Sequence, residues 1–182
     1  HSKTAVYANG LSIERVLQQH DEIDAVNAEG LGITVLKGIE SDILPDGSLD
    51  YPDDILQRFD MVVASVHSAF RLPKEQQTER IIAAIRNPYT TILGHPTGRL
   101  LLARDGYEID MERIIDAAAE TGTVIELNAN PYRLDLDWRW HAYAVQKGVR
   151  IGINPDSHET ATLSEVWYGV TIARKGMLTE TN

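Results

Sequence analysis

Five residues with metal-binding side chains recur at regular intervals along the chain: Glu40, His67, His95, Asp156 and His158. His67 follows Glu40 by 27 residues, His95 follows His67 by 28, and Asp156 follows His95 by 61. One strand-and-helix unit of an α/β barrel takes about 30 residues, so these side chains would return to the same rim of such a fold. Carboxylate and imidazole groups suit zinc, manganese or iron. The spacing therefore predicts a metal centre.

The segments that carry these residues have the pattern of buried parallel strands, because they are short, β-branched and apolar almost throughout. Strands are predicted at residues 33–40, 61–67, 91–95, 123–128 and 150–154. Helical patterns lie at about 11–29, 75–86, 110–121, 137–147 and 161–174, the clearest being the one that Asp110 caps and Gly122 ends. This alternation predicts an α/β fold with right-handed crossovers and a long, potentially functional loop at 41–58.

Each candidate ligand also has an explanation that needs no metal. A histidine at the end of a strand is more often a hydrogen-bonded polar residue than a ligand, and Glu40 alone could be a strand-end carboxylate without a role. The segment Asp156-Ser157-His158 alone could be a turn. Only the joint pattern favours the metal centre. His20 and His141 fall within helical patterns, where they are expected to face solvent or core.

Composition narrows the classes of function. A chain of 182 residues suits one domain, and the absence of cysteine excludes disulfides, zinc–thiolate sites and thiol nucleophiles. The formal net charge of −10 argues against a domain that holds nucleic acid by charge alone, although bound cations would change the local charge. No signal peptide or membrane-spanning run is visible, so a cytoplasmic location and no membrane partner are predicted.

Four segments resemble the polymerase and histidinol phosphatase (PHP) family. They are Leu36-Lys-Gly-Ile-Glu40, Ala64-Ser-Val-His-Ser68, Leu93-Gly-His-Pro-Thr-Gly-Arg99 and Glu126-Leu-Asn-Ala-Asn-Pro-Tyr-Arg-Leu-Asp135. The resemblance covers nearly the whole chain and is strongest to the PHP domain at the C-terminus of bacterial family X DNA polymerases. It implies a distorted TIM-like barrel of seven βα units that holds up to three divalent metal ions.

The resemblance also implies a role for each ligand. Glu40 would bridge two ions, and His67 and His95 would complete the second ion's protein ligands. Asp156 would bind the first ion, and His158 the third, beside His1. His1 itself enters the ligand set only through the resemblance.

The chain departs from the family pattern at its start. The family's first His-x-His segment and the aspartate that precedes the position of His1 have no counterpart here. By resemblance, the first two βα units are missing, so fewer than three ions are expected. We interpret the chain as a piece of a longer protein. The open edges of such a truncated barrel would favour pairing with a second copy.

The chemistry expected of such a centre is phosphoester hydrolysis. A bound metal lowers the pKa of water towards about 7 and so provides hydroxide to attack phosphorus at neutral pH. Arg99, Arg133 and, more weakly, Arg71 are the candidates for contacting phosphate. Each could instead be a surface arginine or one paired with a carboxylate.

Three functions are compatible with the sequence. The first is the 3′-5′ exonuclease or 3′-phosphatase domain of a family X DNA polymerase, acting on DNA 3′ ends that the attached polymerase would bring to it. The second is a small-molecule phosphatase of the histidinol-phosphate type. The third is an inactive domain that stabilises a polymerase. The segments Thr97-Gly-Arg99 and Asn130-Pro-Tyr-Arg133 favour the first.

Overall fold

A single parallel sheet organises the chain in the computed structural model, which describes residues 1–181. Its strands are β1 (Gly38–Asp42), β2 (Met61–Ser65), β3 (Ile92–Leu93), β4 (Val124–Asn128) and β5 (Ile151–Asn154). They pair in the order β1-β2-β3-β4-β5, and every pairing is parallel. Since every pairing is parallel, all carboxyl ends lie at one edge of the sheet.

The predicted α/β class and parallel sheet are thus confirmed, whereas the barrel stays a prediction. The strand order is the one that successive βα units produce. Within residues 1–181, however, the order begins at β1 and ends at β5. The structure therefore neither closes the sheet into a barrel nor excludes a barrel in a longer protein.

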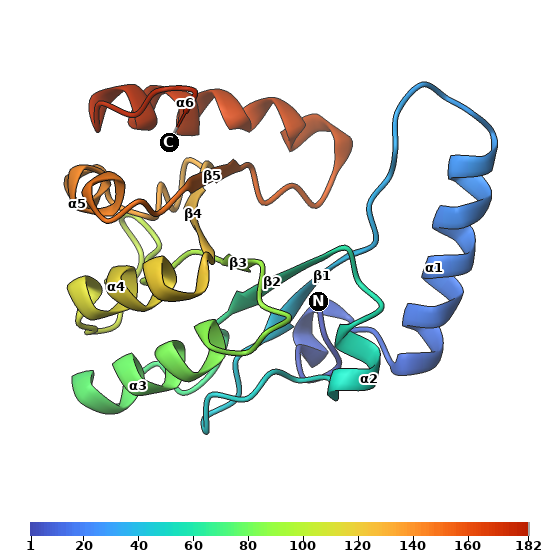
Figure 1. Ribbon diagram of the computed structural model, residues 1–182, viewed down its shortest axis with the longest axis horizontal. Helices are drawn as coiled ribbons and strands as arrows, with labels where there is room; N and C mark the ends of the chain where they lie inside the picture. The colour runs from blue at the N-terminus through green and yellow to red at the C-terminus, as the bar shows by residue number, and fades with distance from the viewer. Residues whose placement is uncertain (182) are drawn as a thin grey trace.

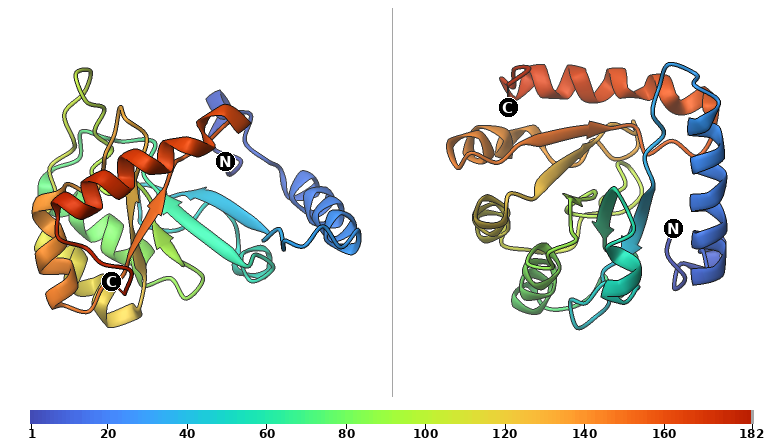
Figure 2. Two further views of the ribbon diagram at one scale, coloured as in Figure 1. Left: turned by 90° about the horizontal axis from the view of Figure 1, so that it is seen from above. Right: turned by 45° about the vertical axis from the view of Figure 1, so that its right-hand side comes forward.

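Helices cover the sheet unevenly. The α-helices are α1 (Ile13–Ala28), α2 (Asp53–Leu56), α3 (Lys74–Ile85), α4 (Met111–Thr121), α5 (His141–Gln146) and α6 (Val166–Lys175). Figure 1 shows α3, α4 and α5 stacked along one side of the sheet and α6 beside β5. Helix α1 stands on the opposite side, connected to β1 by a long loop, as the views in Figure 2 also show.

The core lies between the sheet and the helices α3 and α4. Ile81 and Ile85 of α3, Ile114 and Ile115 of α4, and Ile125 of β4 are all almost completely buried. Burial of one such side chain contributes about 1.5–3 kcal/mol, so this layer fixes the strands from which the polar edge projects. None of the helices within residues 1–181 combines the length and the apolar character needed to cross a membrane.

The helix predicted at 110–121 is confirmed with its caps. The Asp110 side chain accepts a hydrogen bond from the backbone N–H of Arg113 at 3.2 Å, and Gly122 ends the helix with φ of 78°. Glycine adopts this left-handed conformation without the steric cost that a Cβ would impose.

Several predicted boundaries are wrong. Residues 33–37 are not strand, and β1 instead starts at Gly38 and continues past Glu40 to Asp42. The segment before β1 is held by side chains, since Asn27 bonds both the N–H and the carbonyl of Val35. The predicted loop 41–58 contains the end of β1 and helix α2. The helices predicted at 137–147 and 161–174 each begin with a 3₁₀ segment, Trp138–Trp140 and Thr160–Glu165.

Candidate metal centre

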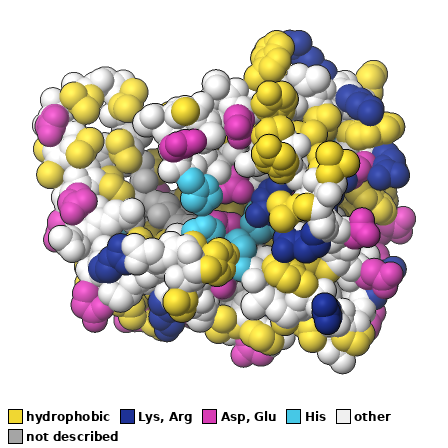
Figure 3. Space-filling model, turned by 180° about the vertical axis from the view of Figure 1, so that it is seen from behind, with side chains coloured by type: hydrophobic (Ala, Val, Ile, Leu, Met, Phe, Trp, Pro, Cys, Tyr) yellow, Lys and Arg dark blue, Asp and Glu magenta, His cyan; other side chains and the backbone are white. Residues whose placement is uncertain are grey.

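The predicted ligands gather at the carboxyl edge of the sheet. Glu40 lies within β1, and His67 and His95 each lie two residues beyond the strands β2 and β3. Asp156 and His158 follow β5 by two and four residues. Figure 3 shows the histidine side chains together in a hollow of one face, with acidic side chains next to them.

The Glu40 carboxylate occupies the middle of the cluster. Its Oε1 lies 3.0 Å from His95 Nε2 and 3.3 Å from His67 Nε2. Its Oε2 lies 3.0 Å from His1 Nδ1. Both carboxylate oxygens therefore face imidazole nitrogens, and the structure brings His1 into the group.

Asp156 and His158 form a second part of the cluster, joined to the first through His1. The Nε2 atoms of His1 and His158 are 3.3 Å apart. His158 Nδ1 lies 3.8 Å from Asp156 Oδ1 and 2.9 Å from the Asp156 carbonyl oxygen. The Asn128 amide donates a hydrogen bond to Asp156 Oδ2 at 3.0 Å. All six predicted ligands thus belong to one continuous group.

Electrostatics in the cluster favour a charged carboxylate and a basic imidazole. Burial disfavours ionisation of Glu40, but hydrogen bonds and charge from His67 and His95 outweigh it and hold the Glu40 pKa well below its usual range. Burial likewise disfavours the charged form of His67, yet hydrogen bonds to Asp42 and Glu40 raise the His67 pKa to about 9. Metal ions would therefore have to displace a proton from His67 at neutral pH.

Asp42 contacts the cluster, and the sequence prediction missed it. Its Oδ1 lies 2.5 Å from His67 Nδ1, and its Oδ2 accepts a hydrogen bond from the Thr4 hydroxyl at 2.9 Å. A carboxylate on the far nitrogen of a metal-binding histidine orients the ring and raises its basicity. The signal was present in the sequence, because Asp42 stands two residues after Glu40 and so shares its face of the strand.

Glu126 supports the cluster from β4. Its Oε2 accepts a hydrogen bond from the His95 backbone N–H at 2.6 Å, and its Oε1 accepts one from the Asn154 amide at 2.9 Å. Burial raises the pKa of this carboxyl. Glu126 therefore pairs with other residues of the fold.

The backbone is unusual at two of the predicted ligands. His95 has φ of 23° and Asp156 has φ of 55°, values that L-residues seldom adopt. Gly94, just before His95, packs so closely on β2 that an added Cβ would lie 2.3 Å from Ser65 Oγ. Such strained residues cluster at functional sites, so these two positions point to a role for the edge.

The three predicted phosphate contacts have different surroundings. Arg99 is engaged by the protein, since it donates to the Arg133 carbonyl at 2.9 Å and to the Asp137 carboxylate at 2.8 Å. Arg133 lies beside the cluster, with Nε 3.5 Å from Asp156 Oδ2. Arg71 is exposed on the loop after His67. Of the three, Arg133 is the best placed for a phosphate near the ligands, and Arg99 matches the carboxylate-paired alternative.

The donor set fits a divalent metal ion. His1, Glu40 and His67 each offer one ligand atom, and these atoms lie within 4.8 Å of one another. Two ligands of one tetrahedral zinc are roughly 3.3 Å apart, given bonds of about 2.0–2.1 Å, and the cluster's nitrogen–oxygen distances of 3.0–3.3 Å are close to that. His95 Nε2 converges on the same carboxylate, so it could join them.

Comparison with known proteins finds relatives that are named as a DNA polymerase/3′-5′ exonuclease and as probable phosphatases. The chain is 49% identical over 176 residues to the DNA polymerase/3′-5′ exonuclease PolX of Bacillus subtilis. The aligned residues make up 97% of this chain and 31% of that protein. It is 34% identical over 137 residues to a probable phosphatase of Caldanaerobacter subterraneus, covering 70% of this chain and 52% of the relative. A probable phosphatase of Thermoanaerobacter sp. is 31% identical over 159 residues, covering 82% and 62%.

No family model matches the chain. The chain spans less than two thirds of the length of each of these three relatives, and about a third of the Bacillus subtilis protein. The structure thus shows an α/β domain with a histidine and carboxylate cluster. The comparisons show that its sequence is similar to that of proteins named as a DNA polymerase/3′-5′ exonuclease and as probable phosphatases.

Proposed function

We propose that this chain is a metal-dependent phosphoester hydrolase domain of the PHP type, acting on the 3′ ends of DNA. The observation that carries the proposal is the convergence of His1, His67 and His95 on the two oxygens of Glu40. The name and the 49% identity of the Bacillus subtilis relative support the substrate class.

Each residue of the centre would have a defined task. Glu40, with its lowered pKa, stays a carboxylate and, with His67, His95 and His1, would hold zinc, manganese or iron ions. Asp156 and His158 would hold a further ion next to His1. A bound divalent ion supplies a water nucleophile at neutral pH and offsets the negative charge of a phosphate.

Residues around the ligands would orient the substrate and the ligand side chains. Asp42 fixes the ring of His67 through Nδ1, and Asn128 fixes the carboxylate of Asp156. The Arg133 guanidinium, beside Asp156, would hold a non-bridging phosphate oxygen. Substrate and ions would therefore be placed by hydrogen bonds that the fold already provides.

A small-molecule phosphatase is the second candidate. It is favoured by the two relatives named probable phosphatase, at 34% and 31% identity. Substrate preference separates the two candidates. The DNA proposal predicts faster manganese-dependent phosphate release from an oligonucleotide with a 3′-phosphate than from histidinol phosphate, and the second candidate predicts the reverse.

The test of the centre is a pair of histidine substitutions. His67→Ala should remove most of the bound metal, measured by mass spectrometry of the purified protein, and should lower hydrolysis of both esters by at least about a hundredfold. His20→Ala is the control, because His20 is a buried histidine that packs on Phe59 outside the centre. If His67→Ala keeps metal and hydrolysis at the level of His20→Ala, the proposed centre is wrong.

A further inference from the structure

A pocket of about 380 Å³ opens beside the second part of the metal cluster. Asp156 and His158 form one wall, and the rest is lined by residues of two loops, among them Leu101, Asn130, Tyr132 and Arg133. None of these loop residues is a predicted metal ligand. The pocket therefore continues the site beyond the cluster, in the direction that a substrate's remaining part could take.

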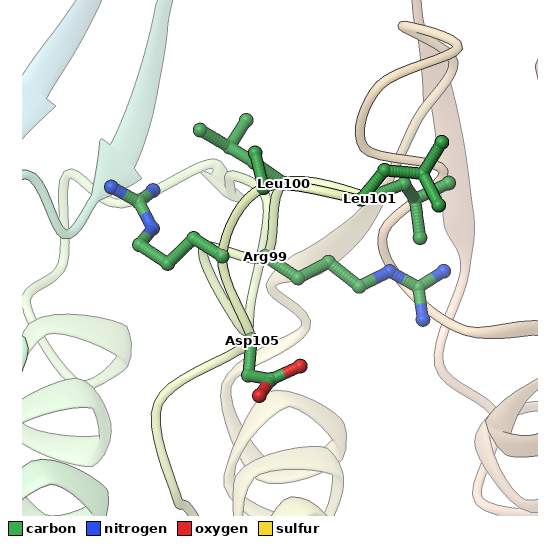
Figure 4. A pocket seen from close by; sticks show the side chains of 7 residues that line it. Arg99, Leu100, Leu101 and Asp105 are labelled. Atoms are coloured by element: carbon green, nitrogen blue, oxygen red, sulfur yellow. The ribbon is translucent and has the colours of Figure 1, made fainter.

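The first loop, Arg99–Asp105, projects apolar side chains. It lines an adjoining hollow of about 460 Å³, and Figure 4 shows Leu100 and Leu101 at one end of the loop and Asp105 at the other. Leu102 is fully exposed and has φ of 64°. A leucine in the left-handed region costs roughly 1–2 kcal/mol, and burial does not offset that cost here.

Hydrogen bonds hold this loop against the turn that carries Tyr132. The Leu101 N–H donates to the Tyr132 carbonyl at 2.6 Å, and Arg99 Nε donates to the Arg133 carbonyl at 2.9 Å. The Tyr132 N–H donates to the Asn130 side-chain oxygen at 2.9 Å. The two walls are thus fixed to each other, as a preformed binding site requires.

The pocket combines a cation with an exposed aromatic ring. Arg133 Nη1 is buried and has no hydrogen-bond partner among the described residues, while its Nε faces Asp156. Tyr132, its neighbour in the chain, is 70% exposed. In Figure 3 basic and apolar side chains gather beside the histidines on the same face. A phosphate beside Arg133 would leave an attached planar group within reach of the Tyr132 ring and the leucines.

We infer that the loop Arg99–Asp105 and the turn Asn130–Arg133 form a nucleotide subsite, which takes the terminal base and sugar of a single-stranded DNA end with its phosphate at the metal centre. This inference rests on the proposed function and adds where the nucleoside binds. Aromatic and apolar side chains beside an arginine are the usual means of holding an unpaired base without reading its sequence. A small polar phosphoester would gain nothing from this apolar wall.

Binding tests the subsite without requiring turnover. The probe is a fluorescent single-stranded hexanucleotide of thymidine with a 3′-phosphate, titrated with the protein without manganese and again with calcium. Loss of one base stack weakens binding by about tenfold or more. Tyr132→Ala should therefore weaken binding about tenfold, Leu102→Ala by a smaller factor, and Tyr132→Phe should bind like the wild type. Leu31→Ala, another exposed leucine, is the matched control and should bind within twofold of the wild type.

Kinetics provide the second readout. The ratio of kcat/KM for the oligonucleotide to kcat/KM for glycerol 2-phosphate, which has no planar group, should fall about tenfold in Tyr132→Ala. The subsite proposal is wrong if Tyr132→Ala binds the hexanucleotide as tightly as the wild type does. It is also wrong if Tyr132→Ala leaves the ratio of the two kcat/KM values unchanged because both values fall by the same factor. Failure of the proposed function looks different: the wild type would then neither retain manganese nor hydrolyse either ester, whereas the binding series would still decide the subsite.

Discussion

Replacing Asp42 with asparagine should weaken metal binding although Asp42 is not expected to touch the metal. The Asp42 carboxylate lies 2.5 Å from His67 Nδ1 and is 4% exposed, so water cannot replace it readily. Asparagine keeps the shape and can still accept a hydrogen bond through its oxygen, but it removes the charge. Loss of such an outer carboxylate typically costs 10–100-fold in metal affinity.

The pH at which affinity is measured decides how much of this loss appears. With the His67 pKa raised to about 9, the wild type at pH 7 must release a proton before His67 can bind metal. A gap of two pH units corresponds to about a hundredfold competition. Asp42→Asn should lower the His67 pKa part of the way towards 6.5 and relieve some of that competition. Asp42→Asn should therefore show the whole 10–100-fold loss of metal affinity at pH 9 and a smaller loss at pH 7.

The measurement is zinc affinity by competition with a chelator at pH 7 and pH 9, together with the His67 pKa by NMR of the metal-free protein. Asp50→Asn is a close control, because Asp50 is also buried and accepts hydrogen bonds from Thr4, yet it lies outside the contacts of His67. The reasoning fails if the two variants change zinc affinity at pH 9 equally, or if Asp42→Asn leaves the His67 pKa unchanged.

Three further predictions concern the scaffold. Arg80→Ala should lower the free energy of unfolding, measured in urea, by about 3 kcal/mol, because the buried guanidinium donates hydrogen bonds to several backbone carbonyls. Arg86→Ala is the control, since Arg86 forms an exposed ion pair, and it should lower the free energy of unfolding by less than about 1 kcal/mol. Gly94→Ala should lower the melting temperature and the metal content together, since its Cβ would overlap β2. Hydrogen bonds hold the Asp137 pKa well below its usual value, and the largest contribution comes from the bond that the Arg139 side chain donates. The stability that Asp137 adds over Asp137→Asn should thus be full above about pH 4 and decline as the pH falls further, which acid titration of unfolding would show.

Most of the cluster could be predicted from sequence because strand order and polarity carry the information. An apolar run that ends in a polar residue places that residue at the carboxyl edge, whichever neighbour the strand takes. His67 and His95, just beyond β2 and β3, follow this logic, and the structure places the Nε2 atoms of both within 3.3 Å of Glu40 Oε1. His1 gave no such signal in the sequence, and only the family resemblance supplied it.

The errors arose where tertiary contacts override local pattern. Ile33, Val35 and Leu36 look like strand residues, yet all three are exposed and the Asn27 side chain occupies the backbone groups of Val35. For Arg99 the sequence left phosphate contact and pairing with a carboxylate both open, because the carbonyl and the carboxylate that it bonds lie more than 30 residues away in the chain. Partners at that separation are invisible to periodicity and spacing.

Strand β4 explains why two strained ligands keep their positions. His95 and Asp156 have positive φ, at a cost of about 1–3 kcal/mol each. Glu126 of β4 accepts a hydrogen bond from the His95 N–H, and Asn128 of the same strand donates one to the Asp156 carboxylate. A hydrogen bond contributes about 0.5–1.5 kcal/mol, and about 1.5–3 kcal/mol when one partner is charged, which is comparable to the strain. One strand that supplies none of the predicted ligands therefore helps to orient the predicted ligands that follow the strands on both of its sides.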